Sequence, residues 1–162
     1  MTWAEFAIAC PELAALGEER FRARELCMLA TLRRNGWPRI SPNELDFVGG
    51  QLLLGMMWQS HKARDLLRDP RCALHSCTAD RFGTEGDFKL YGRAVDVGDP
   101  ALRELYRDAI RARIDWAPEE PSYHLFAIDV EAAGFVTFAG ERYGLAWNPE
   151  GGLRRWQIPP DA

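Results

Sequence analysis

One segment carries most of the information about the fold class: Leu26-Cys27-Met28-Leu29-Ala30-Thr31-Leu32, followed by Arg33-Arg34-Asn35-Gly36. The apolar run has the length of a buried strand, and Asn-Gly is preferred in the tight turns of β-hairpins. We expect the return strand at residues 38–47, where Pro38 and Pro42 favour an edge position because proline cannot donate a ladder hydrogen bond. The segment therefore predicts an antiparallel pair of strands.

The rest of the chain contains short apolar or alternating runs bounded by turn residues, a pattern typical of strands. We expect strands at residues 51–57, 71–78, 87–97, 125–130, 143–147 and 153–158, while residues 134–139 either continue the preceding strand or follow it. His124 is expected just before a strand. Helices are expected at residues 3–9, 11–17, 60–67 and 100–114, with caps at Thr2, Ser60 and Asp99 and an end near Gly17.

This order of elements predicts a fold that is mostly β with flanking helices, in the α+β class. Neighbouring strands joined by tight turns form an antiparallel sheet. Six or more strands with few helices favour a small closed barrel, which leaves no exposed sheet edge. No linker or repeat divides the chain, so we expect a single domain over residues 1–162, with N-terminal helices within residues 1–24.

The composition argues against several classes of function. A net charge of −4 is unfavourable for a nucleic-acid-binding protein. Neither a secretory signal nor an apolar stretch of the roughly 20 residues that a membrane helix needs is found, so no membrane partner is predicted. The four cysteines are irregularly spaced and match no zinc or redox motif. Free thiols in a reducing compartment are the simplest explanation, and we expect a cytoplasmic protein.

No catalytic or metal-binding constellation stands out. The histidines lack carboxylates or cysteines at the spacing of metal ligands, so no metal site is predicted. His75 lies in an apolar strand and is interpreted as a core or interface residue whose ring bonds to backbone. Ser41 and Ser60 lack the elbow motif of hydrolases. We therefore assign no catalytic residue.

A basic helix start is the strongest candidate for a binding site. Ser60-His61-Lys62-Ala63-Arg64 follows an apolar strand, and Ser60 is a good N-cap. Helix N-termini carry partial positive charge and usually attract carboxylates, so cations gathered there favour a bound anion. Free N–H groups, a hydroxyl and a lysine together form a phosphate cradle. The alternative is a solvated face on which Lys62 and Arg64 point into water.

Six short motifs occur in an order that resembles pyridoxamine 5′-phosphate oxidase-like proteins. They are Ala30-Thr31-Leu32; Asn35-Gly36-x-Pro38-Arg39-Ile40-Ser41-Pro42; Gly50-x-Leu52; Ser60-x-Lys62-x-x-Asp65-Leu66; Asp69-Pro70-Arg71-x-Ala73-Leu74-His75; and Gly92-Arg93-Ala94. The resemblance covers residues 1–100 and implies a six-stranded antiparallel split β-barrel that forms a homodimer. It also implies a flavin, usually FMN, in a cleft between the subunits, with a deazaflavin coenzyme as the alternative cofactor.

The resemblance further implies which residues bind the cofactor. Arg39 stands where the family places an arginine that contacts the phosphate. Ser60 and Lys62 match the family's serine and lysine that grip the phosphate, and His61 between them could donate to it. The flavin ring is expected to face the backbone of Ile40, Ser41, Pro42 and Asn43.

Residues near the C-terminus and two departures from the family pattern complete this interpretation. Trp147 and Arg154 could close over the ring bound by the partner subunit, or belong to a packed terminal hairpin. Glu44 lies near the place where the oxidases carry a lysine. Met56-Met57-Trp58 replaces the small or hydroxyl residues that leave room for the ribityl chain.

Several functions stay open at this point. The first is an FMN-dependent oxidoreductase that acts on an unknown small molecule. The substrate motifs of true pyridoxamine phosphate oxidases are not recognisable, so that reaction is not predicted. The alternative is a non-catalytic protein that binds a flavin, a deazaflavin or a tetrapyrrole in the dimer cleft. A third possibility is a vestigial cleft filled by Trp58 and the methionines, because a fold by itself does not define a function.

Overall fold

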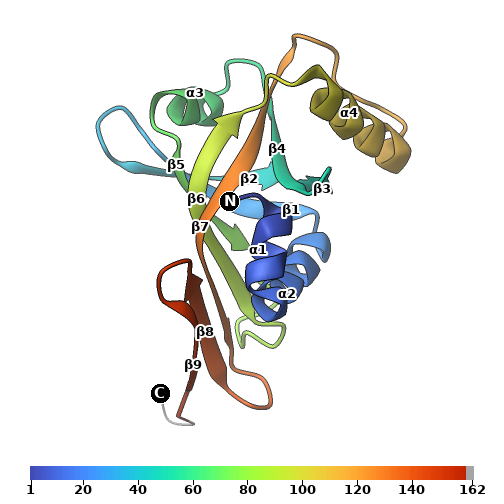
Figure 1. The fold of residues 1–162 in the computed structure, drawn as a ribbon. Coiled ribbons are helices and arrows are strands. Elements are labelled where there is room, and N and C mark those ends of the chain that lie inside the picture. The colour runs from blue at the N-terminus through green and yellow to red at the C-terminus, as the bar shows by residue number, and fades with distance from the viewer. Residues whose placement is uncertain (160–162) are drawn as a thin grey trace.

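The computed structural model describes residues 1–159 and contains one antiparallel sheet with helices on its faces (Figure 1). The helices are α1 (Trp3–Ala9), α2 (Pro11–Arg22), α3 (His61–Arg68) and α4 (Pro100–Ile114). The strands are β1 (Leu26–Leu32), β2 (Pro38–Glu44), β3 (Asp46–Val48), β4 (Gln51–Met57), β5 (Arg71–Ser76), β6 (Asp87–Asp96), β7 (Tyr123–Thr137), β8 (Tyr143–Asn148) and β9 (Gly152–Gln157).

The strand order shows a barrel that is split. The ladders run β2-β1-β5-β6-β7-β4-β3, and β8 pairs with both β7 and β9. Within residues 1–159 no ladder joins β2 to β4, so the sheet is not closed and the expectation of a closed barrel was wrong. Strands β1, β2, β4, β5, β6 and β7 form the predicted six-stranded split barrel, and β3, β8 and β9 bring the sheet to nine strands.

The first hairpin forms as the Asn-Gly signal predicts. Leu32 pairs with Pro38 at the end of the ladder. The turn is closed by hydrogen bonds of 2.9 Å from Arg33 N to Trp37 O and from Gly36 N to Arg33 O, and Gly36 has a φ of 83°. β2 ends the ladder path on this side, which confirms the edge position that its prolines favoured.

The second helix is longer than predicted. Its expected end near Gly17 was wrong, because α2 continues to Arg22. A Cβ at Gly17 would lie 2.4 Å from Cζ of Phe88, so this glycine lets the helix pack closely on the ring from β6. Residue 17 is thus a glycine because of tertiary packing, and it does not mark the end of the helix.

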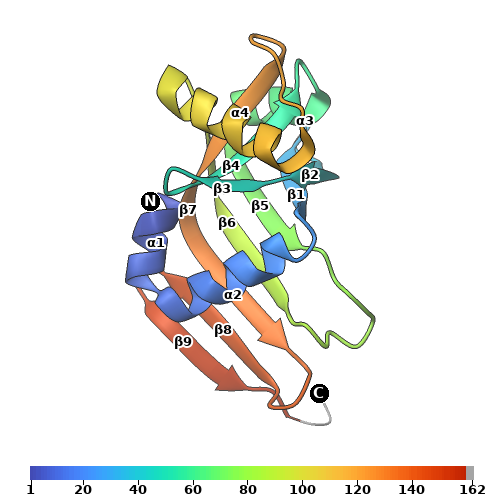
Figure 2. The ribbon, with the colours of Figure 1, turned by 90° about the vertical axis from the view of Figure 1, so that its right-hand side faces the viewer.

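β7 connects the two ends of the molecule. It runs without interruption over 15 residues from Tyr123 to Thr137, so His124 lies within a strand and its expected position before one was wrong. Figure 2 shows α1 and α2 across one face of the lower sheet and α4 at the upper end. The main core lies under α1 and α2, and a smaller apolar cluster lies under α4.

Candidate functional site

The start of α3 has the geometry that its sequence predicts. Ser60 caps the helix, and its Oγ accepts a hydrogen bond from Ala63 N at 3.4 Å. The first turn contains no acidic residue. The two residues that follow the cap, His61 and Lys62, line two different hollows.

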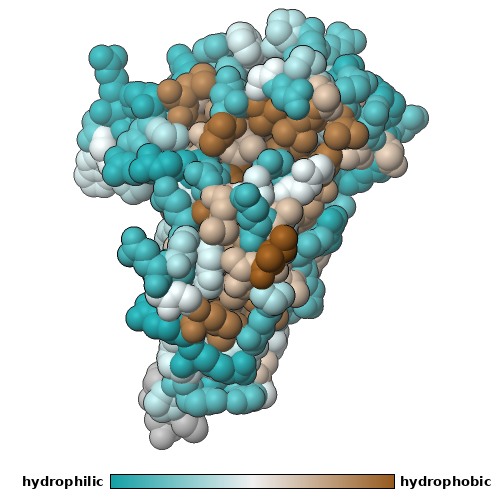
Figure 3. All heavy atoms as spheres, viewed as in Figure 1, coloured by the Kyte–Doolittle hydropathy of each residue, from teal (hydrophilic) through white to brown (hydrophobic). Residues whose placement is uncertain are grey.

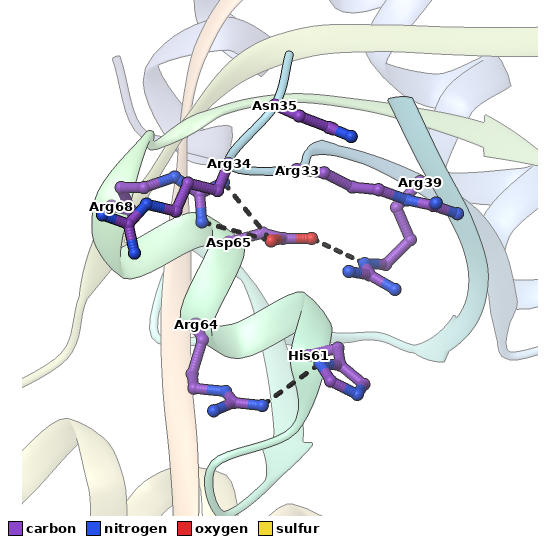
Figure 4. A pocket seen from close by; sticks show the side chains of 8 residues that line it. All are labelled: Arg33, Arg34, Asn35, Arg39, His61, Arg64, Asp65 and Arg68. Atoms are coloured by element: carbon purple, nitrogen blue, oxygen red, sulfur yellow. Dashed lines mark hydrogen bonds and ion pairs between the residues drawn. The ribbon is translucent and has the colours of Figure 1, made fainter. Parts of the chain in front are cut away.

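The first hollow is a charged groove between α3 and the turn of the first hairpin (Figure 4). Its volume is about 540 Å³. The hairpin, the start of β2 and α3 supply the lining side chains: Arg33, Arg34, Asn35, Arg39, His61, Arg64, Asp65 and Arg68. Five arginines face one carboxylate, so the groove is strongly positive in a protein whose net charge is −4.

Asp65 ties the walls of the groove together. Its carboxylate accepts hydrogen bonds from Arg39 Nε at 2.6 Å, from Thr31 Oγ1 at 3.1 Å and from both terminal nitrogens of Arg68 at 3.3–3.4 Å. The Asp65 side chain is only 6% exposed. Burial by itself would raise the pKa of Asp65, but the hydrogen bonds from Arg39 and Thr31 outweigh it and hold the pKa below its ordinary value.

The other cations of the groove are not neutralised by carboxylates. Arg64 Nη2 lies 3.1 Å from Nδ1 of His61. Arg33 and Arg34 are exposed, and their side chains have no hydrogen-bond or ion-pair partner within residues 1–159. The groove therefore combines a neutralised base around Asp65 with a rim of free positive charge.

The second hollow is largely apolar and lies at the split of the barrel. Its volume is about 620 Å³. Lys62, strands β2 and β4, helix α4, the loop after α4, the start of β1 and the start of β7 line it. The residues besides Lys62 are Leu26, Pro42, Asn43, Glu44, Gly55, Met56, Met57, Tyr106, Ile110, Trp116, Pro118, Glu119, Ser122 and Tyr123. Lys62 Nζ donates to Pro42 O at 2.8 Å. Burial lowers the pKa of Lys62.

Asn43 bridges the split between the two strands. Its Nδ2 donates to Gly55 O at 3.2 Å and to Glu44 O at 2.6 Å, whereas its buried Oδ1 has no partner within residues 1–159. On the same side, a Cβ at Gly55 would lie 1.9 Å from the hydroxyl of Tyr106. Asn43 therefore has a buried acceptor without a partner beside the hollow, and α4 approaches β4 closely because residue 55 is a glycine.

With this geometry established, the comparisons place the chain in a family. A family model described as pyridoxamine 5′-phosphate oxidase matches residues 16–137. The chain belongs to the pyridoxamine 5′-phosphate oxidase family. No curated protein matches the sequence of this chain.

Solved structures of the same fold include proteins with different bound molecules in their names. A pyridoxamine 5′-phosphate oxidase-related, FMN-binding protein from Nostoc punctiforme is 19% identical, with a TM-score of 0.65 and coverage of 90% of this chain and 94% of that one. PhzG from Burkholderia lata, in complex with tetrahydrophenazine-1-carboxylic acid, is 15% identical, with a TM-score of 0.66 and coverage of 96% and 92%. A heme binding protein from Mycobacterium smegmatis is 21% identical, with a TM-score of 0.59 and coverage of 88% and 57%.

The predicted site residues of this family member divide among separate places. Arg39 and His61 lie in the groove, and Lys62, Pro42 and Asn43 lie in the hollow. Ile40 is 68% exposed on β2. Ser41 is half-buried, and Ser60 acts as the helix cap.

Trp147 and Arg154 lie on a third surface. Trp147 is buried and its ring lies 4.9 Å from that of Phe6. Both residues line a hollow of about 340 Å³ on β6, β7, β8 and β9, whose lining shares no residue with the other two hollows. One subunit alone therefore does not bring them to Lys62.

The bulky residues at the end of β4 do not fill the hollow. Met56 is buried, Met57 is 77% exposed, and the Trp58 ring stacks on His124 with centroids 4.4 Å apart. The volume of the hollow argues against the vestigial cleft. His75 bonds to backbone as interpreted from the sequence, since its Nδ1 lies 2.6 Å from Ser76 O.

Sequence reasoning missed the groove as a unit. Arg33 and Arg34 were interpreted only as part of a turn, although two arginines beside an Asn-Gly pair are a readable signal. No local signal connects Tyr106 or Trp116 to the hollow, because α4 lies far from β4 in the sequence. Within residues 1–159 we find no metal-binding cluster and no helix long and apolar enough to cross a membrane.

Proposed function

We propose that this protein binds FMN across the first turn of α3 and acts as a flavin-dependent oxidoreductase on a small molecule. A deazaflavin coenzyme is the alternative cofactor. The proposal rests on one observation: His61 lines the cationic groove, and the next residue, Lys62, lines the apolar hollow. A flavin nucleotide likewise combines an anionic phosphate, which suits the groove, with a planar ring, which suits the hollow.

The donor set of the groove fits the phosphate. His61, Arg39 and Arg64 supply nitrogen donors beside a helix N-terminus whose first N–H groups have no partner inside the helix. Arginine is suited to this role because its planar guanidinium can donate two parallel hydrogen bonds to a phosphate. Ser60 contributes by holding the helix start in place through its hydrogen bond to Ala63 N.

The hollow fits the ring. Its volume of about 620 Å³ lies within the roughly 300–1,000 Å³ of small-molecule sites. Pro42 and Met57 supply apolar surface for the ring. Of the four residues 40–43 whose backbone the family resemblance assigns to the ring, Pro42 and Asn43 line this space.

FMN supplies the redox chemistry when it is bound. The residues of the chain bind and orient the cofactor and exclude water from the site. Lys62 is held against Pro42 O at 2.8 Å, so its ammonium presents positive charge at the edge of the hollow next to the groove. We assign no proton transfer to a side chain, because none of the residues at the hollow forms an acid–base pair with another.

We propose further that the protein is a cytoplasmic homodimer in which Arg154 reaches the site of the partner subunit, while Trp147, buried against Phe6, supports the neighbouring strand from within the core. Exposed large hydrophobic residues support an interface, among them Trp37, Tyr91 and Val95. Figure 3 shows hydrophobic residues gathered on the upper part of one face, at the level of α3 and α4. Light scattering should give twice the mass of 18.4 kDa, and a monomer at all concentrations would contradict a shared site.

A second candidate is non-catalytic binding of a planar ligand, such as a flavin, a deazaflavin or a tetrapyrrole. The observation that favours it is Glu44, whose largely exposed carboxylate lies at the hollow, 3.7 Å from Arg113. A carboxylate there disfavours the negative charge that builds up on a reduced ring. The heme-binding relative from Mycobacterium smegmatis shows that its fold is compatible with a tetrapyrrole.

The test begins with the absorption spectrum of the purified protein and with titration of FMN, followed by flavin fluorescence. We expect yellow protein or quenched fluorescence on binding, and Lys62→Ala should weaken binding by about tenfold or more. Rapid reoxidation of reduced, bound FMN by an added acceptor would exclude the non-catalytic candidate. Failure of FMN and of a deazaflavin to bind would refute the main proposal.

A further inference from the structure

The hollow has two sides that differ in their lining. Strands β1 and β2 and the start of α3 line one side with Leu26, Pro42 and Lys62, whereas α4 and the loop that joins it to β7 line the other. Figure 1 shows α3 and α4 on opposite sides of the upper end of the sheet. The groove is lined only by α3, β2 and the first hairpin. A flavin whose phosphate lies in the groove therefore brings its ring to the α3 side, and the α4 side is left for a substrate.

The hollow contains an exposed aromatic ring and two carboxylates. Trp116 is 60% exposed, and Glu119 in the same loop is exposed and has no hydrogen-bond or ion-pair partner within residues 1–159. The other carboxylate is that of Glu44, which lies 3.7 Å from Arg113. Arg113 is closer to Asp46, at 2.9 Å, so its charge is shared between the two acids. The negative charge at the hollow is thus only partly neutralised by the chain.

A buried hydroxyl also faces the hollow. Tyr106 of α4 is 3% exposed, and its hydroxyl has no hydrogen-bond partner among residues 1–159. The hydroxyl lies beside Gly55, another lining residue, since a Cβ at Gly55 would be 1.9 Å from it. Buried polar groups are normally hydrogen-bonded, so an unpartnered hydroxyl in the wall of a hollow points to a polar group on a ligand.

The charge of the lining favours a cation. Among the residues that the structure describes, Lys62 is the only cationic side chain that lines the hollow, and its Nζ is held by Pro42 O at 2.8 Å on the α3 side. No free cation is therefore present at the α4 side, within residues 1–159, to pair with an anionic ligand. An indole ring attracts a cation to its face, and a carboxylate forms charge-assisted hydrogen bonds with an N–H donor.

We propose that the α4 side of the hollow binds the substrate, and that this substrate is a planar organic cation that carries no anionic group. Its ring packs on Trp116, its positive nitrogen is attracted by Glu44 and Glu119, and a polar substituent reaches the hydroxyl of Tyr106. The inference rests on the proposed function for the position of the flavin ring, and it adds the charge and the chemical class of the substrate.

The experiment compares three ligands that share one aromatic ring and differ in charge. Protonated naphthylmethylamine, neutral naphthylmethanol and anionic naphthoate are titrated by calorimetry at low ionic strength, where exposed charges are least screened. We expect the amine to bind about tenfold more tightly than the alcohol, and naphthoate to bind most weakly. Equal binding of the amine and the alcohol, or tighter binding of naphthoate, would overturn the inference.

Matched variants test the two carboxylates. Glu44→Gln/Glu119→Gln should lose the preference for the amine and keep its affinity for the alcohol. Glu12→Gln/Glu150→Gln removes the same charge from two exposed residues that do not line the hollow, and it should retain the preference. An equal loss in this control would show that only net charge matters and would also overturn the inference.

A single substitution guards against an effect on folding. Glu119→Gln removes a side chain that has no partner within residues 1–159, so thermal unfolding should be unchanged while the preference for the amine falls severalfold. An unchanged preference in this variant would remove Glu119 from the site and contradict the assignment of the α4 side.

FMN titrated into the same samples separates the two proposals. A protein that binds FMN but does not prefer the amine contradicts only the inference about the substrate. A protein that prefers the amine through Glu44 and Glu119 but does not bind FMN contradicts only the flavin function. Binding of the amine to FMN-saturated protein would support neighbouring places for ring and substrate, and its complete displacement by FMN would overturn the assignment of the α4 side.

Discussion

The groove and the hollow differ in how they are built, although they meet at the first turn of α3. The groove is made by ion pairs: Asp65, 6% exposed, holds Arg39 from the hairpin and Arg68 from the helix. The hollow is made by space left between elements, where β2 and β4 do not pair and α4 covers the opening. One site thus depends on charge balance, and the other on side-chain volume.

The groove and the hollow should therefore respond to different substitutions. Removal of a charge at the base of the groove affects folding, because a buried ion pair that loses one partner is strongly destabilising. An added methyl group at the hollow affects packing. If both hollows belong to one ligand site, both kinds of change will also affect ligand binding.

The largest effect is expected for Asp65→Asn. The substitution removes the charge that Arg39 and Arg68 share, so the free energy of unfolding should fall by about 3 kcal/mol. Urea denaturation measures it. Asp108→Asn is the matched control, since Asp108 forms an exposed ion pair with Arg111 and should cost less than about 1 kcal/mol. Equal effects of the two substitutions would contradict the structural role of Asp65.

The same carboxylate predicts a pH dependence. Because the folded pKa of Asp65 lies below its ordinary value of 3.8, its contribution to stability is fully present above that value. It is lost as the pH falls through the lower, folded pKa. The difference in unfolding free energy between the unmodified protein and Asp65→Asn should therefore shrink below pH 3.8. A difference that stays constant down to the acid limit would mean that the charge of Asp65 does not matter.

The next effect is expected for Gly55→Ala in the hollow. The new Cβ would lie 1.9 Å from the hydroxyl of Tyr106, a buried residue of α4. We expect a loss of about 2 kcal/mol in unfolding free energy, with weaker binding of any ring in the hollow. Gly98→Ala is the control, since nothing lies within 4 Å of its Cβ position. Unchanged stability in Gly55→Ala would show that α4 moves away freely.

A smaller effect is expected on ligand binding, where substitutions in the groove and in the hollow should affect different parts of the flavin. His61→Gln should weaken FMN binding about tenfold and leave the binding of riboflavin, which lacks the phosphate, unchanged. Lys62→Gln should weaken both, because Lys62 lies at the hollow. Fluorescence titration measures all four affinities. Identical profiles for the two variants would refute the assignment of phosphate and ring to different hollows.

The smallest effect is expected for Trp58→Ala, just before α3. The ring stacks on His124 at 4.4 Å, and we expect a loss of about 1 kcal/mol in unfolding free energy. Phe82→Ala is the control, because Phe82 is 64% exposed and should change stability by less than about 0.5 kcal/mol. A neutral Trp58→Ala would mean that the stack does not hold the junction between groove and hollow.

Much of the fold could be predicted because its signals are local. The Asn-Gly turn, the Ser60 cap and the Asp99-Pro100 start of α4 each depend on neighbouring residues, and each was found where it was expected. The end of α2 could not be predicted at Gly17, since the reason for the glycine is the ring of Phe88, which lies far away in the sequence.

The local patterns of the sequence determined an antiparallel sheet and a third helix that begins with a cap, a histidine and a lysine, and the family resemblance implied that the barrel is split. Only the tertiary structure decided that His61 and Lys62 serve different hollows and that Arg33 and Arg34 join the groove. The physical reason is the separation along the sequence between the residues that interact. Caps and turns are set by hydrogen bonds between residues a few positions apart, whereas a groove is set by ion pairs such as Arg39–Asp65, whose partners meet only after the chain has folded.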